Sequence, residues 1–244
     1  MGRTNVTYGG YLQVENLLDL QRPVGDDTDQ GGELFFIIAH QTSELWLKSL
    51  LVDLEGLDEA VTRREPLLGA PMIHARRALA GARMLVAGIE SLRALDTEAF
   101  LGFRDHLGSA SGAQSSQFAR VRALVGIGKP NGGPIEASLR TFAQHHQVAL
   151  DAVAAGNAVH DAWYWLVDTL LEFSSALWRW GVYHVDVTQR LIGALPGTGG
   201  TSGVQFLTDR LLERPFPTLW RGRVETLRRQ LGAEPLTRQS RGTP

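Results

Sequence analysis

The chain has 244 residues, enough to bury a hydrophobic core without disulfides or structural metals. Its 24 basic and 26 acidic residues give a formal net charge of −2, so no positive excess exists to neutralise a nucleic acid or an anionic membrane. The chain has no cysteine, which excludes disulfides, iron–sulfur clusters, zinc–thiolate sites and thiolate-bound or covalently attached haem.

Residues 1–32 predict an N-terminal arm that consists of a short helix and a loop. A helical pattern occupies residues 10–20, and a polar stretch rich in Asp and Gly continues to Gly32. The start of the chain lacks a basic flank followed by an apolar run, and no apolar stretch approaches the roughly 20 residues of a membrane span. We therefore expect a cytoplasmic protein without a membrane or nucleic-acid partner.

Long helical patterns follow the arm, and no segment shows the period of two that a half-buried β-strand requires. The segment from Glu33 to about Leu57 has no Pro and no internal Gly before Gly56, and its length favours a buried helix over a strand. Residues 72–98 predict a second long helix, and residues 156–194 predict one long helix or two joined end to end. The sequence therefore predicts an all-α fold with a single domain over residues 1–244.

Three segments between the helices predict loops or turns: residues 103–117, 129–134 and 196–203. The first is rich in Ser and small residues, which is typical of a structured loop. The last, PGTGGTSG, follows a helix and lacks a Lys, so it does not fit a phosphate-binding loop. Its glycines indicate either a flap that closes over a ligand or a flexible connection between helices. Residues 225–244 predict a partly flexible tail.

Two histidines lie on predicted helices where they could face a ligand. On its own helix face His184 has mostly apolar neighbours, which are Leu177, Trp180, Val187, Thr188 and Leu191. Such a histidine either packs in a core or binds a metal, and an imidazole in an aromatic-rich helix also suits a haem. His40 shares a helix face with Phe36, Ser43 and Leu47, a composition found in small-molecule pockets and at ordinary helix interfaces.

Arg104 lies at the start of the Ser-rich segment, where small residues would let a ligand carboxylate approach its guanidinium. Most arginines are simply solvated, and only this setting distinguishes Arg104. No zinc-binding spacing connects the remaining histidines, which are His74, His106, His145, His146 and His160. The chain also lacks the G-x-S-x-G motif and the cysteine on which common hydrolase sites depend.

Several segments resemble those of tryptophan 2,3-dioxygenases and occur in the same order: TYGGYLQVENLL, FFIIAHQTSELWLK, FRDHLGSASGAQSSQF, YHVDVTQRLIG, PGTGGTSGVQFL and FPTLW. The resemblance extends from Tyr8 to about Trp220. The combination of HQTSELW, LGSASG and GTGGTSGV is specific to this family. The resemblance implies a helical bundle with a haem pocket between long helices, assembled as a homotetramer that is a dimer of dimers.

The resemblance implies that the cofactor is haem b and that the co-substrate is O2. His184 would be the axial ligand of the haem iron, and Ser111 would lie near the haem on its distal side. His40 would be the catalytic distal histidine, placed to hydrogen-bond the indole N–H of the substrate.

The remaining implied roles concern the substrate. Phe36 would line the pocket, Arg104 would bind the substrate carboxylate, and Thr198 would contact the amino-acid end. Tyr8 and Tyr11 match N-terminal aromatic residues that complete the pocket of a neighbouring subunit in the family.

The implied reaction belongs to tryptophan catabolism by the kynurenine pathway: O2 is inserted into the indole ring of L-tryptophan to give N-formylkynurenine. Two residues depart from the family pattern, Ala39 where glutamine is common and Asp105 where proline is common. They keep open a haem monooxygenase that acts on a substituted tryptophan or a related aromatic amino acid. A non-catalytic haem protein that senses oxygen is a further alternative, in which Arg104 and Thr198 would have no role.

Overall fold

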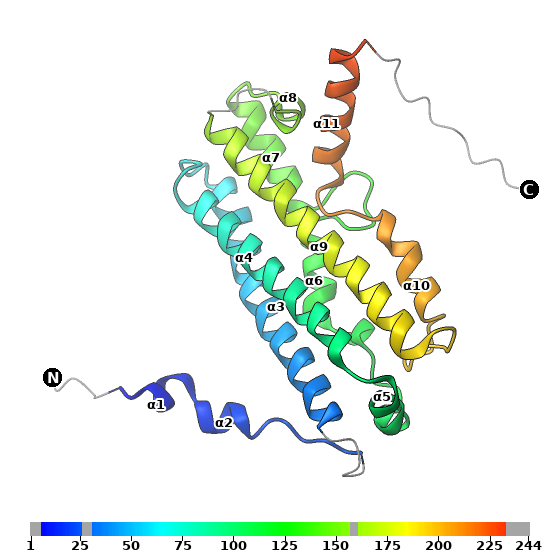
Figure 1. The fold of residues 1–244 in the computed structure, drawn as a ribbon. Helices are drawn as coiled ribbons and strands as arrows, with labels where there is room; N and C mark the ends of the chain where they lie inside the picture. The colour runs from blue at the N-terminus through cyan, green and yellow to red at the C-terminus, as the bar shows by residue number, and fades with distance from the viewer. Residues whose placement is uncertain (1–5, 26–30, 157–160, 233–244) are drawn as a thin grey trace, which may run out of the picture.

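Figure 1 shows the fold in a computed structural model, which describes residues 6–25, 31–156 and 161–232. Within these ranges the chain forms helices and no β-strand, so the all-α prediction is confirmed. In the same ranges, no helix has the length and apolar character to cross a membrane.

The α-helices are, in chain order, Tyr8–Leu12 (α1), Val14–Leu18 (α2), Gly32–Thr62 (α3), Ala70–Ser91 (α4), Thr97–Arg104 (α5), Ser116–Leu124 (α6), Pro134–His145 (α7), Leu150–Ala154 (α8), Ala162–Ile192 (α9), Val204–Asp209 (α10) and Pro217–Gln230 (α11). Short 3-10 helices occupy Leu92–Ala94 (η2), Asp105–Leu107 (η3), Gly112–Gln114 (η4) and Arg210–Leu212 (η5).

The first long helix, α3, is longer than the sequence pattern predicts. It continues past Leu57 because Gly56 lies inside the helix and does not end it. A Cβ atom at position 56 would lie 2.5 Å from the His74 ring, so this glycine makes room for a side chain of α4. Glycine lowers the stability of a helix, but at this position it allows α3 and α4 to pack closely.

The predicted helix over residues 72–98 is wrong at its C-terminal end. α4 ends at Ser91, and after η2 the chain is extended at Leu95 and Asp96 before α5 begins. The Asp96 side chain accepts hydrogen bonds from the backbone N–H groups of Glu98 (2.7 Å) and Ala99 (3.4 Å), so it caps α5. The apolar residues keep a helical spacing through this junction, so the sequence pattern does not show that α4 and α5 are separate helices.

The other sequence predictions agree more closely with the observed elements. The pattern at 10–20 forms α1 and α2, which are separated by Gln13 in a left-handed conformation. α9 is one continuous helix, although residues 157–160 of the predicted segment lie outside the described residues. The tail predicted at 225–244 begins as helix because α11 continues to Gln230, and residues 233–244 are again outside the described part.

Three long helices form the centre of the fold, and α4 packs against both α3 and α9 (Figure 1). Ala75, Ala78 and Ala82 of α4 are fully buried, and their small side chains allow close approach of the neighbouring helices. α6 and α7 pack against α3, while α8 and α11 pack together beside α9. α1 and α2 extend away from this bundle (Figure 1).

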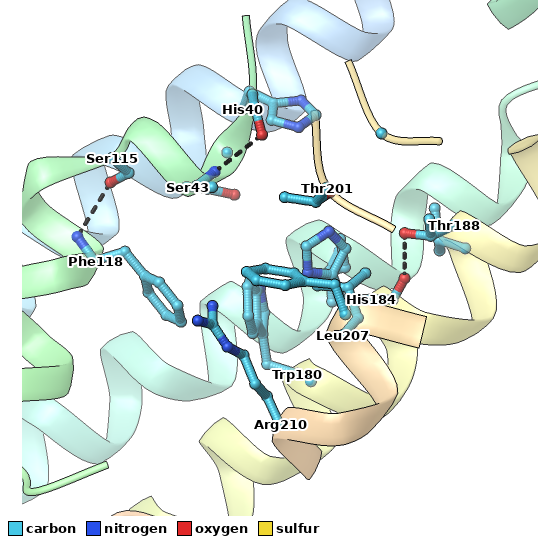
Figure 2. A pocket seen from close by; sticks show the side chains of 18 of the residues that line it. His40, Ser43, Ser115, Phe118, Trp180, His184, Thr188, Thr201, Leu207 and Arg210 are labelled. Carbon is cyan, nitrogen blue, oxygen red and sulfur yellow. Dashed lines mark hydrogen bonds between the residues drawn. The ribbon is translucent and has the colours of Figure 1, made fainter. Parts of the chain in front are cut away.

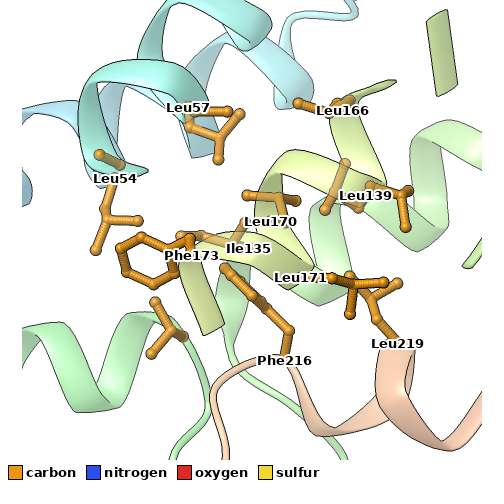
Figure 3. Close-up of a cluster of buried hydrophobic side chains, with 14 of the residues drawn as sticks. Leu54, Leu57, Ile135, Leu139, Leu166, Leu170, Leu171, Phe173, Phe216 and Leu219 are labelled. Atoms are coloured by element: carbon orange, nitrogen blue, oxygen red, sulfur yellow. The ribbon is translucent and has the colours of Figure 1, made fainter. Parts of the chain in front are cut away.

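The buried side chains form two hydrophobic clusters. The larger cluster joins α3, α4, α7 and α9 and includes Leu54, Leu170 and Phe173 (Figure 3). The smaller cluster surrounds α5 and includes Phe100 and Phe103. Burial of each such Leu or Phe side chain stabilises the fold by roughly 1.5–3 kcal/mol.

Glu136 on α7 fixes the start of α11. Its buried carboxylate accepts hydrogen bonds through Oε1 from the backbone N–H groups of Thr218 (2.9 Å) and Leu219 (3.1 Å) and from the Thr218 hydroxyl (2.6 Å). The first N–H groups of a helix have no partner within the helix, and a negative charge there interacts favourably with the helix dipole. Glu136 therefore attaches α11 to the bundle.

We expect Glu136→Ala to lower the free energy of unfolding by about 2–3 kcal/mol, because it removes the charged cap from the buried N–H groups of α11. Urea-induced unfolding followed by circular dichroism measures the change. Glu172→Ala is the control, because Glu172 forms an ion pair with Arg83 in which both side chains are exposed, and its loss should cost under about 1 kcal/mol. Equal effects of the two substitutions would contradict the assigned role of Glu136.

Candidate functional site

A cavity of about 810 Å³ lies between the two hydrophobic clusters. Its walls include Leu47, Leu85 and Leu177 of the larger cluster and Ile89 and Val187 of the smaller one. This volume is within the range of about 300–1,000 Å³ that is typical of small-molecule sites. Six of the residues singled out in the sequence line it: Phe36, His40, Arg104, Ser111, His184 and Thr198.

The two helix faces predicted from periodicity both face this cavity. The face of α3 contributes Phe36, His40, Ser43 and Leu47. The face of α9 contributes Leu177, Trp180, His184, Val187, Thr188 and Leu191. Figure 2 shows His40 and His184 approaching the same space from these two helices, with Thr201 between them in this view.

His184 is a neutral imidazole at physiological pH. Burial is the main cause that lowers its pKa from 6.5 to about 4, and the neighbouring His40 contributes to the same shift. The Trp180 ring, one helical turn earlier, lies with its centroid 5.0 Å from that of the imidazole. No described residue hydrogen-bonds the His184 ring, so a ring nitrogen is available to a ligand.

The hydrogen bond of His40 fixes the tautomer of its ring. Nδ1 lies 2.8 Å from the carbonyl oxygen of Phe36, which can only accept a hydrogen bond, so Nδ1 carries the proton. Burial lowers the pKa of His40, while this hydrogen bond and the nearby Glu44 partly oppose the shift. In the neutral ring Nε2 is therefore a hydrogen-bond acceptor.

Aromatic contacts hold Phe36 and His40 in place. Their ring centroids are 4.0 Å apart, and Phe36 also contacts Phe100 (5.8 Å) and Phe103 (5.4 Å). The last two rings belong to the smaller hydrophobic cluster and meet edge to face at 5.3 Å. α5 therefore supports the part of α3 that carries both site residues.

Arg104 is the last residue of α5, and its side chain is only 19% exposed. Nη2 donates a hydrogen bond of 2.7 Å to the carbonyl oxygen of Pro196. Nε is buried and has no hydrogen-bond partner among the described residues. A buried donor without a partner is costly, so a ligand with an acceptor group at this position would be favoured.

The Gly-rich loop 196–203 lies against the Ser-rich segment. The Thr198 hydroxyl donates a hydrogen bond of 2.6 Å to the Ala110 carbonyl oxygen. Gly199 lies so close to Ser111 that a Cβ atom there would come within 2.7 Å of the Ser111 Cβ. The glycine therefore allows the two segments to meet, and the loop covers one side of the cavity.

Tyr8 and Tyr11 do not reach the cavity of their own chain. They lie on α1, and 78% and 77% of their surfaces are exposed. Of the residues predicted for the site, these two alone are absent from the cavity wall.

Several cavity residues were not predicted from the sequence as site residues. Arg210 on η5 reaches into the cavity between Phe118 and Trp180 (Figure 2), and Arg122 forms an ion pair with Glu213 at 2.9 Å. Arg210 and Arg122 stand in ordinary amphipathic sequence, which carries no signal of a site. No group of three or more metal-ligating side chains occurs in the described part of the chain.

Comparison with known proteins places the sequence among those of one family. A family model described as tryptophan 2,3-dioxygenase matches residues 1–161 and 147–225. Tryptophan 2,3-dioxygenase from Bacillus cereus is 31% identical over 266 residues, which cover 91% of this chain and 94% of that protein. The corresponding protein of Caulobacter vibrioides is 31% identical over 263 residues, covering 88% of this chain and 97% of the relative.

The lowered pKa of His184 predicts how stability depends on pH in the chain without added cofactor. Between pH 6.5 and about 4 the unfolded chain binds a proton that the folded chain does not, so stability falls as the pH falls through this window. The contribution is on the order of 3 kcal/mol, and His184→Phe should remove it. Urea unfolding at several pH values measures the slope. An unchanged slope in His184→Phe would show that His184 is not the residue responsible.

Proposed function

The chain belongs to the tryptophan 2,3-dioxygenase family, and we propose that it inserts both atoms of O2 into the indole ring of L-tryptophan to give N-formylkynurenine. The proposal rests on one observation above all. Two neutral imidazoles face one apolar cavity from opposite helices. Nε2 of His40 can accept a hydrogen bond, and the His184 ring, which no described residue hydrogen-bonds, can bind a metal.

The cavity fits a haem b held by His184. The donor set is a single neutral imidazole with no thiolate, and the surrounding wall is largely aliphatic and aromatic. Ser111 lines the same space. When bound, the haem supplies the redox chemistry that activates O2, and the protein supplies binding and orientation.

The residues of α3 provide a place for the indole ring. Phe36 offers an aromatic wall, and Nε2 of His40 accepts a hydrogen bond from the indole N–H. A hydrogen bond of this kind fixes the orientation of the ring relative to the reacting centre. It also gives His40 a direct contact with the substrate, as the assigned catalytic role requires.

Arg104 and Thr198 recognise the amino-acid end of the substrate. The unpartnered Nε–H of Arg104 donates to the substrate carboxylate, and a planar guanidinium can bind a carboxylate through two parallel hydrogen bonds. Thr198 lies in the loop that already contacts Ala110. Because the loop covers one side of the cavity, it would limit the access of water and strengthen the electrostatic contacts with the substrate.

The assembly in this proposal is a homotetramer, a dimer of dimers, in which Tyr8 and Tyr11 complete the pocket of a neighbouring subunit. The extension of α1 and α2 away from the bundle supports it (Figure 1). So do apolar residues that α3 leaves exposed in the monomer, which are Leu34, Phe35, Ile38, Leu45 and Trp46.

One observation favours a second candidate, a haem monooxygenase that acts on a substituted tryptophan. Of the two departures from the family pattern, only Ala39 lines the cavity, next to His40. The Asp105 side chain is 93% exposed and is not part of the cavity wall. A small residue at position 39 leaves room for a substituent on the indole ring.

The deciding experiment supplies the haem-loaded protein with L-tryptophan and ¹⁸O2 and measures the mass of the product. We expect N-formylkynurenine with both oxygen atoms labelled. One labelled atom would identify a monooxygenase, and a haem protein that forms no product from tryptophan or methyltryptophans would be a sensor. His184→Ala should not retain haem, and a normal haem spectrum in this variant would refute the ligand assignment.

Arg104→Gln should lower kcat/KM for L-tryptophan by about 30-fold or more, since loss of one partner of a desolvated charge pair costs about 2–5 kcal/mol. Steady-state kinetics with tryptophan and with tryptamine, which has no carboxylate, separate the effects. The variant should lose its preference for tryptophan but keep its activity on tryptamine. Arg83→Gln is the control, because Arg83 is exposed and paired with Glu172. Equal losses on both substrates would contradict carboxylate binding by Arg104.

A further inference from the structure

Arg210 is placed by contacts between the C-terminal segment and α9. The indole N–H of Trp178 donates a hydrogen bond of 3.0 Å to the carbonyl oxygen of Leu211. A Cβ atom at Gly181 would lie 3.2 Å from Leu211 Cδ2, so η5 packs closely on α9 at this point. Gly181 is three residues before His184 and shares its helix face. These contacts hold Arg210 beside the cavity wall that carries His184.

The guanidinium of Arg210 is oriented by an aromatic ring but has no acidic partner within the described residues. Its central carbon lies 3.8 Å from the centroid of the Phe206 ring, so the aromatic ring supports one face of the plane. Stacking of this kind leaves the N–H groups at the edge of the plane free. Figure 2 shows the side chain entering the cavity between Phe118 and Trp180.

Of the three arginines that line the cavity, Arg210 differs from Arg104 and Arg122 in having no protein partner among the described residues. Within the described chain, Arg122 is paired with Glu213, whereas Arg210 forms no ion pair or hydrogen bond through its side chain. Arg104 contacts the Pro196 carbonyl oxygen and forms an ion pair with Asp105 at 3.9 Å, and in the proposed function it also binds the substrate carboxylate. Arg210 is exposed to solvent, so its charge carries no burial penalty. Its guanidinium is nevertheless held at the edge of a largely apolar cavity with its N–H groups unpaired, a position from which it can bind an anionic group on a ligand.

We propose that Arg210 is a positioning residue that binds a propionate carboxylate of the haem. This inference rests on the haem binding of the proposed function. A haem b carries two carboxylates on a flat apolar ring. The apolar cavity suits the ring, and the positively charged Arg210 at its edge suits a carboxylate. The planar guanidinium can donate two parallel hydrogen bonds to one carboxylate. Arg210 would thereby help to orient a haem held by His184, and it does not take part in the reaction itself.

The test measures the rate of haem transfer from the holoenzyme to an excess of apomyoglobin. We expect Arg210→Gln to release haem about five- to tenfold faster, since the residue is exposed and its contribution is moderate. Arg210→Lys, which keeps the charge but loses the bidentate geometry, should be intermediate. Arg214→Gln is the matched control, because Arg214 also stacks on aromatic rings, Trp178 and Trp220, but does not line the cavity.

A second arm replaces haem by its dimethyl ester, in which both propionates are uncharged. Wild type and Arg210→Gln should then release the cofactor at the same rate. Release of haem at the wild-type rate by Arg210→Gln, or the same ratio of rates with the ester, would overturn the inference. So would a raised KM for tryptophan with unchanged haem release, which would assign Arg210 to the substrate.

The outcomes separate this inference from the proposed function. A wild-type chain that binds no haem would refute the proposed function. A chain that binds haem but releases it at the same rate with and without Arg210 would refute only the inference. If Arg210→Gln does not fold, Arg210→Lys and the wild-type protein with the ester decide. Wild type that holds the ester as firmly as haem would then overturn the inference.

Discussion

The packing of α4 against both α3 and α9 is the constraint on which the rest of the structure depends. The buried alanines of α4 allow close approach, and the two neighbouring helices, each 31 residues long, are thereby fixed relative to one another. Each carries core residues in one half and site residues in the other. Leu54 and Leu170 pack in the larger cluster, while His40 and His184 face the cavity several turns away. Because each helix is continuous, packing of its core half also fixes the position of the half that carries the site residues.

The apolar character of the cavity wall determines the electrostatics of the site. Desolvation lowers the pKa of both His40 and His184, so both rings are neutral and can act as acceptor or ligand. The same environment penalises unpaired charge, and the cationic groups enter from short elements at the margin. Arg104 ends α5, and Arg210 begins η5. The result is an apolar centre suited to aromatic groups and a cationic margin suited to carboxylates.

Helix periodicity in the sequence predicted the faces of α3 and α9 correctly. The setting beside the Ser-rich segment singled out Arg104, and the family motifs gave roles to Arg104, Ser111 and Thr198. Six of the eight predicted site residues line one cavity. The element boundaries were less accurate. Gly56 does not end α3, because it makes room for His74, and the junction before α5 depends on capping by Asp96. The pattern of apolar residues predicts neither boundary, because one depends on a side chain of a neighbouring helix and the other on local hydrogen bonds.

The sequence by itself determined the all-α class, the residues that share a face on each long helix, and the resemblance to the tryptophan 2,3-dioxygenase family. Only the tertiary structure decided that the two faces meet across one cavity and that Ala39 lines it, while the exposed Asp105 lies outside the wall and pairs with Arg104. It also decided that Arg210 joins the wall with no partner in the described part of the chain. The physical reason is that periodicity describes one helix at a time. The relative placement of residues far apart in the chain follows from the packing of side chains contributed by several helices, and no single segment contains that information.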